Sequence, residues 1–292
     1  MKRMNFGYAV VAATALTLTG CGGSSDDSSG TLNLAITDAA IDSAQSVFVQ
    51  ISGVEVHSNS QGAQQFDFSE AKTIDLLNLQ GSASAPLLES VALEAGSYQW
   101  MRLKVVTEGD LDTYIVLDDG SSYELNIPSG SETGLKMNRG FDLAVNGSVD
   151  FTVDFDLRKS ITAKGLKQGN PEFKLRPTLR TTDNSEIGHV NGMVDGTLLT
   201  QLCGDDNNYA VYIFEGSDVT ADDEGSATSP ITSSLLDDQY QYEIGFINAG
   251  DYTLALTCTA DLDDPELDDD IVFVQSANVT IENKQTTSLN IE

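Results

Sequence analysis

Few residues of this sequence are of the types that do acid-base or nucleophilic chemistry. His57 and His189 are the only histidines, and each could act as a general base. The sequence contains no HExxH, no GxSxG and no Gly-rich phosphate loop. Carboxylate pairs are frequent, so residue types alone permit a glycoside hydrolase. The short loops predicted below disfavour a substrate cleft, so we expect no enzymatic activity and no catalytic residue.

Two of the three cysteines, Cys203 and Cys258, form an even pair in one predicted domain. In an exported protein such a pair predicts a disulfide. Neither cysteine lies in a CxxC motif, and His189 is the only nearby histidine. Metal binding by this pair is therefore the weaker interpretation.

The third cysteine, Cys21, ends the stretch Leu18-Thr19-Gly20-Cys21. Lys2 and Arg3 precede an apolar run too short to span a bilayer permanently, which predicts a signal peptide over residues 1–20. The four residues resemble the lipobox of bacterial lipoproteins. This resemblance implies that Cys21 carries acyl chains such as palmitate, which anchor the protein in a membrane. A plain secretory signal is the alternative. Residues 21–30 predict a flexible tether, and Gly22 favours the outer over the inner membrane.

Acidic side chains gather in the loops of the C-terminal part. Closely spaced loop carboxylates can supply the six to eight oxygens that Ca²⁺ prefers. One interpretation is therefore a weak Ca²⁺ site, and the other is a solvated acidic loop that maintains solubility. The candidate ligands are Asp261, Asp263, Asp264, Glu266, Asp268, Asp269 and Asp270.

The charge of the chain is strongly negative and unevenly divided. The formal net charge is -30, which disfavours nucleic acid and anionic membrane surfaces as partners. Residues 188–292 contain one basic side chain, Lys284, against 21 acidic ones. The change in charge and the polar stretch at residues 181–186 predict two domains, over residues 31–185 and 186–292.

Alternating Val, Ile, Thr, Phe and Tyr residues recur between turn signals from Thr31 onward. The pattern is typical of antiparallel β-sandwiches, so we predict an all-β fold of two such domains. A strand is predicted over residues 72–76, and another over residues 98–106 should bury Met101, Leu103 and Val105. Two hairpins are predicted, with turns at residues 118–121 and at Asn146-Gly147. The strand that begins at Ser148 should bury Val149, Phe151, Val153, Phe155 and Leu157. Its opposite face, with Asp150, Thr152, Asp154 and Asp156, should be solvated or, as an alternative, bind a cation. The basic residues at 158–180 should pair with these carboxylates across strands.

Aromatic side chains are the candidate contacts for a ligand. Tyr and Trp offer contact area at low entropic cost, and we expect four of them at a binding surface for a protein or a glycan. Packing of Trp100 between sheets or domains is the alternative. The four candidates are Tyr98, Trp100, Tyr209 and Tyr240.

The first predicted domain resembles the DUF4382 family of uncharacterised exported bacterial domains. The resemblance rests on Thr37-Asp38-Ala39, Val54-Glu55-Val56-His57, Leu93-Glu94-Ala95-Gly96-Ser97-Tyr98 and Val153-Asp154-Phe155-Asp156, in this order. It implies a β-rich exported domain and brings no catalytic residues.

The second domain is similar to the carboxypeptidase regulatory-like, transthyretin-type sandwiches, with Gly-x-Val at Gly188 and Ala-Gly-x-Tyr at Ala249. Both domains use the same device, a glycine turn followed by a tyrosine that enters the next strand. We expect a lipid-anchored envelope protein of binding or structural type. The alternatives are an envelope module that binds Ca²⁺ and, less favoured, a hydrolase.

Overall fold

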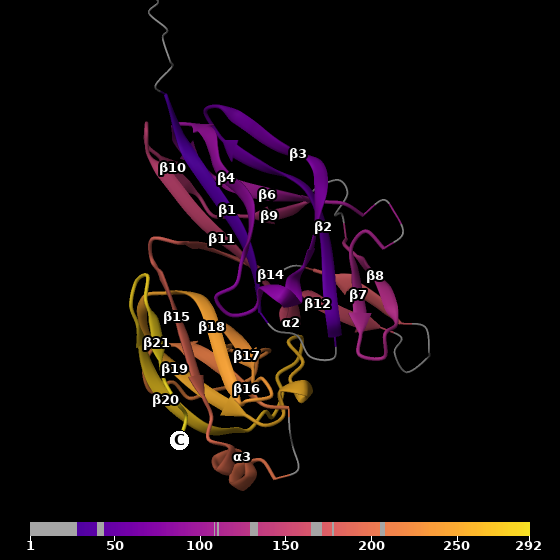
Figure 1. Ribbon diagram of the computed structural model, residues 1–292, viewed down its shortest axis with the longest axis vertical. Helices are drawn as coiled ribbons and strands as arrows, with labels where there is room; N and C mark the ends of the chain where they lie inside the picture. The colour runs from indigo at the N-terminus through magenta and orange to yellow at the C-terminus, as the bar shows by residue number, and fades with distance from the viewer. Residues whose placement is uncertain are drawn as a thin grey trace, which may run out of the picture.

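The computed structural model describes residues 28–39, 44–107, 109, 111–128, 134–164, 171–176, 178–204 and 208–292, and it is built mainly of β-strands (Figure 1). Strands β1 to β14 pair among themselves, as do β15 to β21. The first set comprises β1 (Ser29–Ala39), β2 (Ala44–Ser58), β3 (Gly62–Asp75), β4 (Ala85–Glu94), β5 (Gly96–Tyr98), β6 (Trp100–Val105), β7 (Tyr114–Leu117), β8 (Ser122–Asn126), β9 (Leu135–Met137), β10 (Phe141–Leu143), β11 (Ser148–Asp156), β12 (Ile161–Lys164), β13 (Glu172–Leu175) and β14 (Thr178–Asp183). The second comprises β15 (Ile187–Met193), β16 (Ala210–Glu215), β17 (Thr232–Leu235), β18 (Gln241–Asn248), β19 (Gly250–Thr257), β20 (Phe273–Ile281) and β21 (Thr286–Ser288).

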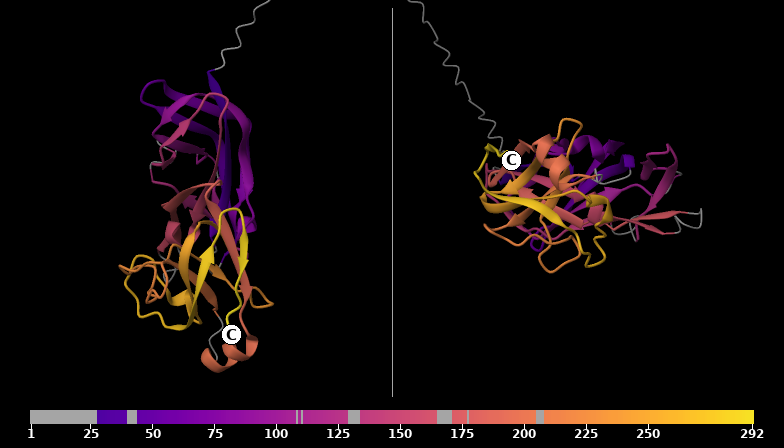
Figure 2. Two further views of the ribbon diagram at one scale, coloured as in Figure 1. Left: turned by 90° about the vertical axis from the view of Figure 1, so that its left-hand side faces the viewer. Right: turned by 90° about the horizontal axis from the view of Figure 1, so that it is seen from below.

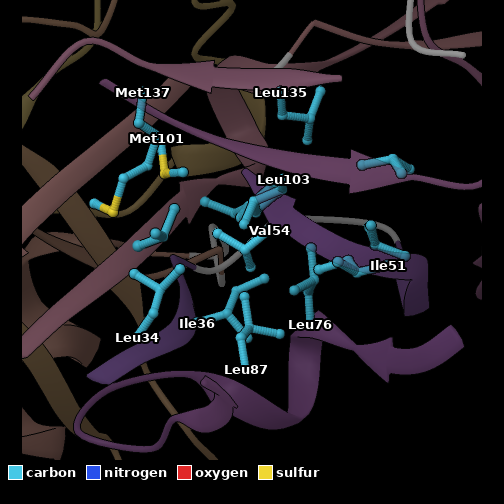
Figure 3. Packing of buried hydrophobic residues seen from close by; sticks show 14 of the residues in the cluster. Leu34, Ile36, Ile51, Val54, Leu76, Leu87, Met101, Leu103, Leu135 and Met137 are labelled. Carbon is cyan, nitrogen blue, oxygen red and sulfur yellow. The ribbon is translucent and has the colours of Figure 1, made fainter. Parts of the chain in front are cut away.

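The first sandwich packs a four-stranded sheet, in the order β14-β11-β1-β4, against a larger sheet centred on β2. Its core lies between these sheets, where Leu34 and Ile36 of β1 point toward Val54 and Leu103 (Figure 3). Strand β6 alternates buried and half-buried residues, with Met101 and Leu103 inside. The predicted core face of β6 is therefore confirmed.

The sheets are not purely antiparallel. Strand β1 lies between β11, to which it is parallel, and β4, to which it is antiparallel. Further parallel pairs join β8 with β13 and β15 with β21. The hairpin of β7 and β8 is confirmed, and Gly120 in its turn has a φ of +82°.

The second predicted hairpin is wrong. A turn forms, with Asn146 at a φ of +58° and a hydrogen bond from Gly147 N to Ala144 O (2.9 Å). Its flanking strands separate, because β10 pairs with β5 while β11 pairs with β1 and β14. Thr31 N donates to Gly147 O (2.9 Å), so β1 occupies the edge of β11 that a hairpin partner would need.

The prediction of a solvated face on β11 is wrong for three of its four residues. Asp150 is exposed, but Thr152, Asp154 and Asp156 are buried. The second sandwich and basic side chains of the first cover this face, as described below. Both faces of β11 are therefore covered, although its sequence alternates apolar and polar residues. The buried Asp154 and Asp156 are tolerated because basic side chains pair with them.

The second sandwich packs the three-stranded sheet β18-β15-β21 against the four-stranded sheet β17-β16-β19-β20. Val190, Ile244 and Leu254 contribute to the core between them. The predicted disulfide is confirmed: Cys203 and Cys258 are bonded, with Cα atoms 5.5 Å apart. Cys203 follows α3 (Gly196–Leu202), a helix that the strand-like sequence pattern does not predict.

Within the described ranges, four short helices connect the strands. Besides α3 they are α2 (Leu157–Ser160) and the 3-10 helices η1 (Leu76–Leu79) and η3 (Ala260–Leu262). Asp156 caps α2 by accepting a hydrogen bond from Lys159 N (3.2 Å). Helix α2 therefore begins directly after β11 and places its basic residues beside the second sandwich.

The two sandwiches lie end to end (Figures 1 and 2). The described chain enters at the outer end of the first sandwich, and α3 lies at the outer end of the second. The connection between them is a tight turn in which Glu186 N donates to Asp183 O (2.9 Å). Residues 181–183 belong to β14, so this connection holds the domains close together.

Candidate functional site at the domain junction

A cluster of buried polar side chains joins the sandwiches, and Arg158 of α2 lies at its centre. Arg158 Nη1 donates to Tyr212 Oη (2.6 Å) and to the carbonyl oxygen of Ala260 (3.1 Å). Its Nε lies 3.9 Å from Glu224 Oε1, with both side chains almost fully buried. Arg158 thus extends from the first sandwich into the second.

The acidic partners of Arg158 are themselves held in place. Tyr212 Oη donates to Asp263 Oδ2 (2.7 Å), and Glu224 N donates to Asp263 Oδ1 (3.2 Å). Burial raises the pKa of Glu224 to about 8, although Arg158 opposes the shift. Burial also raises the pKa of Asp263 and that of Tyr212. Hydrogen bonds thus connect Arg158, Tyr212 and Asp263 across the junction, whereas Glu224 Oε2 is buried without a hydrogen bond in the part of the chain that the structure describes.

Two more cations of the first sandwich contribute to this junction. Arg180 binds Asp154 on the neighbouring strand (Nη2 to Oδ2, 2.6 Å) and donates through Nη1 to Phe246 O (2.8 Å). Lys159 Nζ lies 3.4 Å from Asp156 Oδ2 and donates to Pro230 O (2.9 Å). The predicted cross-strand pairing of basic residues with the β11 carboxylates is confirmed for Arg180. Lys159 pairs with Asp156 locally, three residues along the chain. Each cation also bonds a carbonyl oxygen of the second sandwich.

A groove opens beside the junction, between η1 and the outer face of the sheet β18-β15-β21. Its volume is about 490 Å³, and Gln80 and Gly81 of the first sandwich contribute to its lining. The two sandwiches touch closely here: a Cβ atom at Gly245 would lie 2.0 Å from Gly81 O. Gly81 itself has a φ of +68°, which favours glycine. We call this space, including its walls on β15, β17, β18 and β21, the interdomain groove.

Hydrogen bonds orient the polar groups of the interdomain groove. Ser288 Oγ lies 2.7 Å from Asn191 Oδ1, and Asn290 Oδ1 accepts from Met193 N (3.1 Å). Asp237 Oδ1 accepts from Gln241 N (2.8 Å). The sequence does not predict this groove, because its walls come from segments about 200 residues apart.

Tyr98 is not a surface contact, and that prediction is wrong. Only 2% of its surface is exposed, because its hydroxyl donates to Glu94 O (2.6 Å) and closes the turn before β5. Tyr252 does the same in the second sandwich, where its hydroxyl donates to Asn248 O (2.7 Å). Both resemble the tyrosine corner of β-sandwich proteins.

Trp100 is half-buried within a layer of side chains on the outer face of the first sandwich. Its ring stacks on His57 with centroids 4.7 Å apart. Arg102 and Lys136 lie 4.7 and 4.9 Å from the ring centroid. The ring is therefore engaged in stacking and cation–π contacts.

Tyr209 and Tyr240 lie together in the second sandwich. Their ring centroids are 6.1 Å apart at an angle of 73°. Tyr240 is 41% exposed and Tyr209 is half-buried. Tyr240 precedes β18 and lies next to Gly196 at the start of α3. It is the most exposed of the four aromatic candidates.

The acidic loop at residues 261–270 turns most of its carboxylates to solvent. Asp261, Asp264, Glu266, Asp268 and Asp270 are exposed, Asp269 is half-buried and Asp263 points into the junction. Within the described residues no three His, Cys, Asp or Glu side chains are close enough to hold a metal ion. The structure therefore does not bring the seven predicted ligands together.

Cys21 and the predicted signal peptide lie outside the described residues. Among the residues that are described, no helix has the length and apolar character needed to cross a membrane. His189 is half-buried, and its Nδ1 accepts a hydrogen bond from Phe246 N (3.3 Å). Burial lowers the pKa of His189, and its contacts are structural.

Residues 29–177 match the model of the family described as Domain of unknown function (DUF4382). No curated protein matches the sequence.

Among solved structures, the chain is similar to the Bacillus anthracis TIE protein, at 11% identity and a TM-score of 0.23 over 90% of this chain. It spans 34% of that protein's length. The minor pilin GBS52 of Streptococcus agalactiae is 12% identical over 89% of this chain and 94% of its own, with a TM-score of 0.22. BcpA, the major pilin subunit of Bacillus cereus, is 10% identical over 90% and 99%, also with a TM-score of 0.22.

Proposed function

The chain belongs to the DUF4382 family, and we propose that it is a non-enzymatic binding or spacing protein of the cell envelope, anchored through acyl chains on Cys21. The observation that carries the proposal is the end-to-end arrangement of two sandwiches with a buried polar junction (Figure 2). The described chain enters at one end, so an anchor at Cys21 would leave the second sandwich and α3 farthest from the membrane.

Two further observations support this proposal. The disulfide between Cys203 and Cys258 suits an oxidising compartment such as the periplasm or the cell surface. Both histidines have structural contacts, His57 with Trp100 and His189 with Phe246. The side chains most suited to general-base catalysis therefore serve packing.

Fractionation of cells that express the full chain or its Cys21→Ser variant tests the anchor. We expect the unaltered protein to enter the detergent phase and the variant, if exported, to remain in the aqueous phase, because two or more acyl chains give stable anchoring. A matched Cys203→Ser and Cys258→Ser variant keeps Cys21 and should still enter the detergent phase. Equal partition of the Cys21→Ser variant and the unaltered protein would contradict the anchor.

A further inference from the structure

We propose that the interdomain groove binds an uncharged oligosaccharide. The inference rests on the proposed function, since it names the ligand class of a binding protein. The groove is concave, lies between two domains and has a volume of about 490 Å³, within the usual range for small-molecule sites.

The chemistry of the lining sets the ligand class. Amide and hydroxyl side chains dominate it, together with the carboxylates of Asp237 and Glu243. In the lining that the structure describes there is no basic side chain, so an anionic sugar would meet no counter-charge. Sugar hydroxyl groups both donate and accept hydrogen bonds, as this mixture requires.

The polar groups of the groove are held on strands rather than on loose loops. Because Asn191 Oδ1 lies 2.7 Å from Ser288 Oγ and Asn290 Oδ1 accepts from Met193 N, their Nδ2 groups serve as the donors. Glu243 lies opposite Asn191 in the register of β15 and β18, which places a carboxylate acceptor next to an amide donor. This alternation suits neighbouring hydroxyl groups of one sugar ring.

The ends of the groove complete the site. Met193, which is 48% exposed, offers an apolar contact at the edge of β15. Gln80 of the first sandwich also lines the groove, so a ligand that fills it would touch both domains. An extended peptide is the competing ligand class, because the edge strands β17 and β18 line part of the groove and peptides can add to a strand edge. The amide and hydroxyl side chains of the lining favour the sugar.

An array of uncharged and anionic oligosaccharides, probed with the purified full chain, tests the proposal, followed by titration calorimetry with the bound sugars. We expect at least one uncharged oligosaccharide to bind. Glu243→Gln and Asn191→Ala should each weaken it about tenfold, the loss of one good hydrogen bond. Glu215→Gln, an exposed site on the opposite sheet, is the matched control and should bind normally.

Gln80→Ala is the second groove variant, because this change in the first sandwich leaves the second sandwich intact. Binding of anionic sugars alone, binding that Glu243→Gln, Asn191→Ala and Gln80→Ala all leave unchanged, or no binding to any uncharged sugar would each overturn the inference. A selected peptide that competes for the groove while sugars do not would also overturn it. Membrane partition of Cys21→Ser is a separate readout, so failure here leaves the anchor proposal standing.

Discussion

The two sandwiches close the same kind of turn with Tyr98 and Tyr252, yet they differ in charge and in covalent support. The first contains no cysteine and most of the basic residues; the second contains a disulfide and one basic side chain, Lys284. At the junction, the cations Arg158, Lys159 and Arg180 come from the first sandwich and extend to the second. The acidic sandwich thus obtains buried positive charge from its neighbour, so its stability should depend on the junction.

The largest effect is expected from Arg158→Met. This change leaves Glu224 and Asp263 buried beside an apolar side chain. Above about pH 8, where Glu224 is charged, breaking such a buried ion pair typically costs about 3–5 kcal/mol. We expect the second sandwich to unfold at lower denaturant concentration. Circular dichroism measures the loss of structure, and limited proteolysis at the connecting turn reports separation of the sandwiches.

Arg176→Met is the matched control, because Arg176 also pairs across the two domains. It lies 4.0 Å from Glu266, and both side chains are more than half exposed. Exposed pairs contribute less than about 1 kcal/mol. Equal destabilisation by Arg158→Met and Arg176→Met would contradict the role of the buried junction.

The disulfide should have the next largest effect. Replacing Cys203 and Cys258 with Ala opens a loop with a sequence separation of 55 residues, which should destabilise the second sandwich by about 3–4 kcal/mol. Trp100 is the only tryptophan and lies in the first sandwich, so its fluorescence reports that domain separately. If the unfolding transition seen by Trp100 fluorescence shifts as far as that of the second sandwich, the loss of the disulfide also destabilises the first sandwich, and the prediction of a local effect is wrong.

A smaller effect is expected from pH. The pKa of Glu224 rises from an ordinary value of 4.5 to about 8. The folded protein therefore keeps a proton that the unfolded chain releases, and stability should fall as pH rises from about 4.5 to 8. Asp263 and Asp156 shift in the same direction, so Glu224→Gln should reduce this fall without abolishing it. Denaturant titrations at several pH values measure the slope, and an unchanged slope would contradict the assignment.

Local patterns in the sequence predict much of the fold. The alternation in β6, the turn between β7 and β8 and the pair Cys203–Cys258 depend on nearby residues or on residue type, and all three are found as predicted. Strand β3 begins at Gly62, well before the predicted strand at residues 72–76, and its additional residues are largely exposed. Such an edge strand carries little apolar alternation for a pattern to detect.

The wrong predictions concern what covers a surface. A period of two shows that β11 has two faces, but not that a second domain buries Asp154 and Asp156. The pair Asn146-Gly147 predicts a turn, but not that β1 occupies the edge of β11. Tyr98 looks like a contact residue until its bond to Glu94 O is known. The sequence feature that indicates the junction is the group of basic residues after β11, because a largely acidic chain needs partners for them.

The smallest effect is expected from added salt, and it distinguishes a solvated acidic loop from a Ca²⁺ site. We expect NaCl, MgCl₂ and CaCl₂ at matched ionic strength to raise the melting temperature of the second sandwich equally, since the exposed carboxylates of residues 261–270 do not converge and salt screens their repulsion. The first sandwich, with its more balanced charge, should respond less. A rise that saturates with Ca²⁺ alone and disappears in Asp264→Asn or Asp269→Asn would instead establish the predicted Ca²⁺ site, because these residues already meet through Asp264 N and Asp269 Oδ2 (2.8 Å).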